Sequence, residues 1–116
     1  MKRDDDLVRE MLLGFETQED WLVLEPQFLD MSSEDRKRYG HIQLMIDAGL
    51  MAEVGDGTFR ITFQGHDYIA AIRSDNVWAK TKEGAAKVGG MTLGMMKDLA
   101  IAYVKQEAAE KLGIQL

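Results

Sequence analysis

One stretch of the sequence, residues 32–73, constrains the fold more than any other. It begins with a serine that can cap a helix, and the helical pattern that follows ends at Gly49, which can adopt the left-handed conformation of a C-terminal cap. Two short apolar strands then flank Gly55-Asp56-Gly57, a strong hairpin signal because the turns that match strand twist need positive φ. A further helix, capped by Thr62, runs to about Arg73. This order of elements is that of the second half of a winged helix-turn-helix.

The segments on either side of this stretch complete the predicted architecture. Capping aspartates and an apolar stripe predict a helix over about residues 4–17, and the apolar run at 21–24 predicts a brief strand that pairs with the hairpin. A last helix opens at Thr92. We expect an α+β fold, with a winged helix-turn-helix-like domain and small antiparallel sheet over residues 1–75. A C-terminal helical extension over residues 76–116 is expected to pack on the same domain.

Length and composition bound the class of protein. The 116 residues suit one domain, and 46% hydrophobic with 29% charged residues is the composition of an ordinary globular protein. The longest apolar runs fall far short of the ~20 residues of a membrane span, and the first residues lack the pattern of a signal peptide. The sequence has no cysteine, which fits a reducing compartment. We therefore expect a cytoplasmic protein without membrane partners.

The net charge of −6 is unevenly distributed. Residues 1–35 carry three basic and eleven acidic side chains, residues 36–75 carry five of each, and residues 76–116 carry six basic and four acidic ones. A domain that neutralises many phosphates usually has a basic excess on one face. Any DNA-binding face of this chain would therefore have to be a small basic patch on an otherwise acidic protein.

A basic triplet at the start of the central helix supports a hypothesis of duplex DNA binding. Gln43, further along the helix, can hydrogen-bond base edges, and Lys2 and Arg3 could add phosphate contacts. His41 flanks the same face and could contact DNA, although we favour a solvated surface histidine. The candidate DNA-binding residues are Arg36, Lys37, Arg38, His41, Gln43 and Arg60.

Other residues on this surface weaken the DNA hypothesis. The predicted wing carries Asp56 at its tip, whereas a wing that enters a minor groove usually presents arginine or lysine. Leu44 and Asp47 fall on the outer face of the central helix, where an aspartate would repel phosphate. The basic triplet is also explained as a solvated run that balances Glu34 and Asp35.

The last helix suggests a protein partner instead. It is apolar over more than one stripe, so it is either well buried or pairs with another surface. The candidate contact residues are Met95, Met96, Leu99 and Tyr103. The helix could join two copies into a homodimer, which would also suit a protein that reads two DNA half-sites. Alternatively, the helix and the acidic front third could hold a host or phage protein.

Catalytic and metal-binding motifs are absent from the sequence. The two histidines, His41 and His66, show no H-E-x-x-H spacing, and there is no cysteine to complete a zinc site. A G-x-S-x-G elbow is also missing, and Gly89-Gly90 lacks the lysine of a phosphate-binding loop. We expect no enzyme activity, no metal and no cofactor.

Three blocks of the sequence, Met1 to Arg9, His41 to Leu50 and Ile61 to Trp78, resemble the YjcQ-like proteins. These are small proteins common in bacterial prophages and grouped as a domain of unknown function. The resemblance covers most of the chain in order. It implies a winged-helix-like fold and a phage or mobile-element setting, but no established activity or binding residues. Our hypothesis is a DNA-binding transcription regulator of a phage or prophage, and the alternative is an adaptor that uses the same fold to bind a protein.

Overall fold

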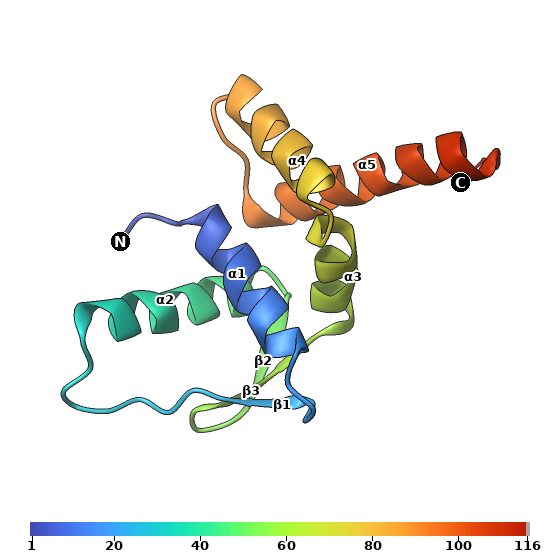
Figure 1. The fold of residues 1–116 in the computed structure, drawn as a ribbon. Helices are drawn as coiled ribbons and strands as arrows, with labels where there is room; N and C mark the ends of the chain where they lie inside the picture. The colour runs from blue at the N-terminus through green and yellow to red at the C-terminus, as the bar shows by residue number, and fades with distance from the viewer. Residues whose placement is uncertain (116) are drawn as a thin grey trace. The chain divides into compact units, whose positions relative to one another are not determined.

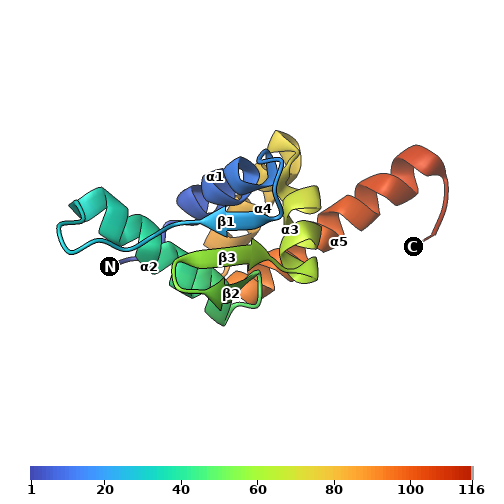
Figure 2. The same cartoon turned by 90° about the horizontal axis from the view of Figure 1, so that it is seen from below.

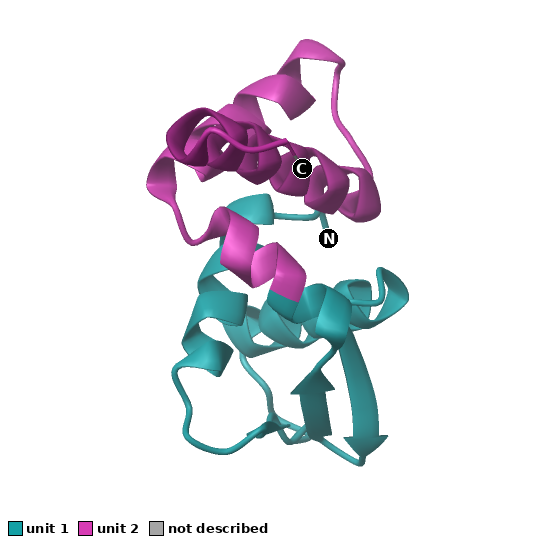
Figure 3. Ribbon diagram, turned by 90° about the vertical axis from the view of Figure 1, so that its right-hand side faces the viewer, with its two compact units in different colours: residues 1–66 teal, residues 67–116 magenta. Residues whose placement is uncertain are grey.

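The computed structural model describes residues 1–115, which form five helices and three strands (Figure 1). The elements are α1 (Asp5–Glu16), β1 (Leu22–Leu24), α2 (Ser33–Asp47), β2 (Met51–Gly55), β3 (Thr58–Ile61), α3 (Phe63–Ile72), α4 (Asp75–Lys87) and α5 (Leu93–Leu112). The chain divides into two compact units, residues 1–66 and residues from 67 onward (Figure 3). The α+β class expected from the sequence is confirmed.

The first unit contains a three-stranded antiparallel sheet in the order β1-β3-β2 (Figure 2). Val23 of β1 lies opposite Phe59 of β3, and Ile61 at the end of β3 lies opposite Met51 of β2. The predicted pairing of the early strand with the hairpin is therefore confirmed. Because β3 lies between the other two strands, it receives hydrogen bonds on both sides, and its side chains alternate between the core and the outer face of the sheet.

Helix starts and stops follow the capping signals of the sequence. The carboxylate of Asp4 accepts a hydrogen bond from the Leu7 N–H at 3.1 Å and caps α1, and Ser32 caps α2 in the same way. Gly49 ends α2 with a φ of +78°. Each cap supplies a partner for a backbone group that the helix itself leaves unpaired.

Thr62 joins the end of the hairpin to the next helix. Its hydroxyl accepts a hydrogen bond from the Gly65 N–H at 3.0 Å and donates one to the carbonyl oxygen of Gly49. β3 ends at Ile61, because the Thr62 cap starts α3 at Phe63. The predicted cap at Thr62 is therefore confirmed.

The core of the first unit forms where α1 and α2 pack together and against the sheet. The buried side chains of this core are Val8, Met11, Leu12, Phe15, Val23, Ile42, Met45, Leu50, Met51, Phe59 and Ile61. Tyr39 of α2 meets the ring of Phe59 edge-on, with ring centroids 6.4 Å apart. This packing fixes which side of α2 remains at the surface.

The second unit contains α4 and α5, which pack against each other. Gly84 marks their close approach, because a Cβ at this position would come within 2.9 Å of the Leu99 side chain. The carboxylate of Glu107 on α5 accepts a hydrogen bond from the Asn76 amide at 3.0 Å. The chain between Ser74, which caps the helix, and Gly89-Gly90 forms α4.

Candidate functional site

Arg38, the third residue of the basic triplet, serves the fold. Its guanidinium donates two hydrogen bonds to Glu25, one from Nη2 at 2.7 Å and one from Nε at 3.1 Å. The same group lies 5.3 Å from the centre of the Phe15 ring, within the range of a cation–π contact. Arg38 therefore connects α2 with the end of β1 and with the core side of α1.

His41 is completely buried, so the interpretation as a solvated histidine is wrong. Its Nε2 accepts a hydrogen bond from the backbone N–H of Asp4 at 2.9 Å, and its Nδ1 lies 2.8 Å from the carbonyl oxygen of Lys37. Since Nε2 is the acceptor, the hydrogen is on Nδ1, which donates to the carbonyl. The helical wheel missed this because the chain before α1 covers that flank of α2.

The first two residues of the triplet remain at the surface. Lys37 forms a 3.4 Å ion pair with Asp4, and a little under half of each side chain is exposed. Hydrogen bonding from the Leu7 N–H, with a smaller contribution from Lys37, holds the pKa of the Asp4 carboxyl below its ordinary value. The exposed guanidinium of Arg36 makes no hydrogen bond or ion pair with any residue between 1 and 115.

The remaining candidates lie elsewhere on the first unit. Gln43 is half-buried on α2, and Arg60 is half-buried on β3 between Leu22 and Ala52 of the flanking strands. Asp47 is exposed as expected, whereas Leu44 is half-buried. Of the six candidate residues, Arg36 and Lys37 line one surface groove, and Lys37 and Arg38 line an adjoining hollow.

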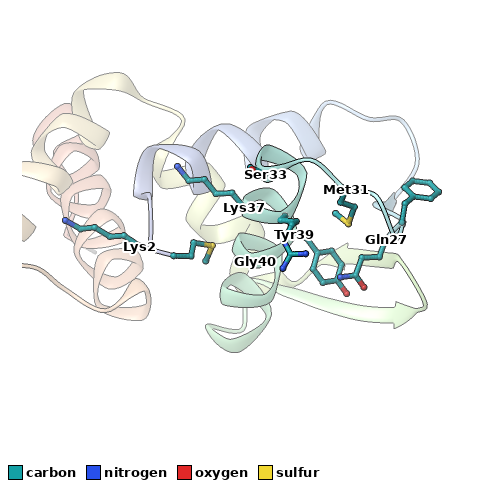
Figure 4. Close-up of a pocket in the computed structure, with 10 residues that line it drawn as sticks. Lys2, Gln27, Met31, Ser33, Lys37, Tyr39 and Gly40 are labelled. Atoms are coloured by element: carbon teal, nitrogen blue, oxygen red, sulfur yellow. The ribbon is translucent and has the colours of Figure 1, made fainter.

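The groove lined by Arg36 and Lys37 has a volume of about 640 Å³ and lies in the first unit; we name it the α2 groove (Figure 4). It is lined by Met1 and Lys2, by Gln27, Phe28 and Met31 of the irregular segment before α2, and by side chains of α2 between residues 33 and 40. The basic side chains of Lys2 and Lys37 lie toward one side of the groove, and Gln27 and Met31 lie toward the other. Sequence reasoning missed this groove, because its three walls come from separate segments.

A second, acidic hollow of about 390 Å³ lies beside the groove and shares Lys37 with it. Its carboxylates come from α1 and its cap, and from the first turn of α2: Asp4, Asp6, Glu10, Glu34 and Asp35. The first unit thus places a region rich in carboxylates next to a groove lined by basic side chains.

The candidate contact residues of the last helix differ in exposure. Met95 is 51% exposed, whereas Met96 is buried, and Leu99 and Tyr103 are half-buried. Ile101, on a neighbouring stripe of α5, helps to line a shallow apolar hollow of about 290 Å³ within the second unit. Met95 is therefore the one member of the four that presents most of its surface to solvent.

No metal-binding cluster occurs among residues 1–115, where no three histidine, cysteine or acidic side chains gather closely enough to hold an ion. Over the same residues, no helix is both long enough and apolar enough to cross a membrane.

Comparison with known proteins places the chain among uncharacterised relatives. A family model described as "Hypothetical protein (DUF2513)" matches residues 2–92. An uncharacterised protein of Haemophilus influenzae is 29% identical over 120 residues, which cover 94% of this chain and 100% of that protein. No solved structure matches the chain.

Proposed function

This chain belongs to the DUF2513 family of hypothetical proteins, and we propose that it is a non-enzymatic adaptor that binds another protein. The observation that carries the proposal is the charge of the first unit. Residues 1–66 contain fourteen acidic and seven basic side chains. A polyanion such as duplex DNA would be repelled by this unit, whereas a protein partner can match its charge pattern locally.

The contacts of α2 support the adaptor over a DNA-binding regulator. A helix-turn-helix joins its two helices by a turn of about three or four residues. Here residues 17–32, which include β1, separate α1 from α2. Arg38 is ion-paired with Glu25 and His41 is buried. The exposed basic residues of the proposed recognition helix are therefore Arg36 and Lys37, and Lys37 is itself ion-paired with Asp4.

We retain a winged-helix-like fold as part of the proposal. The order α2, β2, β3 and the β1 strand that completes the sheet support it. The resemblance to the YjcQ-like proteins, with its prophage setting, also stays a prediction. A homodimer through the last helix is proposed on the exposure of Met95, and light scattering that finds a single chain mass over a broad concentration range would refute it.

Two measurements test the adaptor. In cells that carry the gene, the tagged chain is cross-linked and recovered after nuclease treatment, and we expect one protein to remain bound in a fixed ratio. Titration of the purified chain with duplex DNA at rising salt is expected to show no binding even at low salt. Affinity for DNA that falls steeply with salt, together with loss of all partners to nuclease, would instead establish the regulator.

A further inference from the structure

We propose that the α2 groove binds a short acidic segment of the partner protein, one in which a bulky apolar side chain lies next to carboxylates. This inference rests on the proposed adaptor function, and it names the chemistry that the adaptor recognises. Three features of the first unit point to this ligand: the basic charge of the groove, its apolar end and the acidic hollow beside it.

The charge of the groove is opposite to that of its unit. Lys2, Arg36 and Lys37 line it, and none of its lining residues carries a carboxylate, although residues 1–66 contain fourteen. The Arg36 guanidinium has no ion pair among the described residues, so its donors are available for a bidentate bond to an incoming carboxylate. Such charge-assisted bonds are stronger than neutral ones, and they select an anion.

The other end of the groove is suited to an apolar anchor. Phe28 is 65% exposed, and Met31 and Tyr39 are half-buried beside it. In Figure 4 the Tyr39 ring and Met31 lie on the side away from Lys2. Flexible methionine and aromatic surface adapts to a bulky side chain, and the groove volume lies within the range of ligand sites in proteins. A ligand that fits both ends carries an anionic part and an apolar part.

The acidic hollow favours a peptide over a nucleic acid as the occupant. A nucleic acid strand that extends past Lys37 would bring its phosphates against Asp4, Glu34 and their neighbours. A peptide can place its carboxylates over the groove alone and present neutral or basic side chains to the hollow. A peptide can therefore match the basic groove on one side of Lys37 and the acidic hollow on the other more easily than a nucleic acid can.

The test uses the full chain and a short labelled peptide in which phenylalanine is flanked by aspartates. Fluorescence anisotropy compares Arg36→Glu with Arg60→Glu, which makes the same charge change on the sheet. It also compares Phe28→Ser with Phe63→Ser, another strongly exposed phenylalanine of the first unit. We expect affinity to fall at least tenfold in Arg36→Glu and several-fold in Phe28→Ser, and to stay within twofold in the two controls.

Several outcomes would overturn the inference. The inference fails if Arg36→Glu and Arg60→Glu bind the peptide equally well. It also fails if a peptide with lysines in place of aspartates binds as tightly, or if oligothymidine binds more tightly than the peptide. If Arg36→Glu converted an oligomer into a monomer, a second copy of the chain would be the occupant. If Arg36→Glu lost the peptide but still retained the cross-linked partner, the adaptor would stand and the groove assignment would fall.

Discussion

The imidazole of His41 accepts a hydrogen bond of 2.9 Å from the backbone N–H of Asp4. With the Nδ1–H bond to the Lys37 carbonyl, both ring nitrogens are satisfied in a fully buried position. We expect His41→Ala to lower the free energy of unfolding by about 2–4 kcal/mol, because it removes the partner of the part-buried Asp4 N–H and opens a cavity where the imidazole was buried. Urea denaturation measures this change.

The matched control for this prediction is the second histidine. His66 is exposed, so His66→Ala is expected to change the free energy of unfolding by less than about 0.5 kcal/mol. Equal stability of the two variants would show that the bond to Asp4 contributes nothing to the fold.

Two helical glycines are expected to respond in opposite directions to substitution by alanine. A Cβ at Gly65 would clash with the carbonyl oxygen of Leu50 and the side chain of Ile61, whereas a Cβ at Gly14 meets nothing within 4 Å. Because the backbone at Leu50 cannot yield without disturbing β2, we expect Gly65→Ala to cost more than about 3 kcal/mol. Gly14→Ala is expected to stabilise the chain by up to about 1 kcal/mol, since alanine favours helix. Thermal unfolding of both variants shows whether each substitution raises or lowers stability.

Arg38 is expected to stabilise the fold, whereas Arg36, two residues earlier on α2, is expected to bind the ligand. Arg38→Ala removes the bonds to Glu25 and the contact with Phe15, and we expect it to cost about 0.5–1 kcal/mol, since the pair is partly exposed. Arg36→Ala removes no hydrogen bond or ion pair among residues 1–115 and is expected to leave stability unchanged. Chemical denaturation distinguishes the two, and a larger loss for Arg36→Ala would contradict the assignment of Arg36 to ligand binding.

The features that the sequence predicted correctly are determined by residues close to one another in the chain. The Ser32 cap, the Gly49 stop and the hairpin at Gly55-Asp56-Gly57 are set by chemistry within a few positions, and the structure confirms them. The burial of His41 could not be predicted in this way, because its partner Asp4 lies 37 residues earlier. Helical periodicity says which side a residue faces but not which distant segment covers that side.

The candidate site was only partly predictable for the same reason. The sequence indicated a basic triplet at residues 36–38 and a possible contribution from Lys2, but not that Lys2 and Phe28 would line one groove with Arg36 and Lys37. Neither the N-terminal residues nor the irregular segment before α2 carries a periodic pattern that would place it against the helix. Arg38 was predicted to bind DNA, but it pairs with Glu25, a residue that helical periodicity does not place beside it. Its role is therefore to stabilise the fold.

The capping carboxylate of Asp4 should make stability depend on acid pH. Its pKa is lowered in the fold, chiefly by the Leu7 N–H, so its contribution is complete above the pKa of the unfolded chain, near 3.8, and is lost as the pH falls through the lower value of the folded state. Asp4→Asn should therefore be less stable than the native chain at neutral pH, with a gap that closes in acid. Urea midpoints across this range measure the gap. A constant gap between Asp4→Asn and the native chain across this pH range would contradict the prediction.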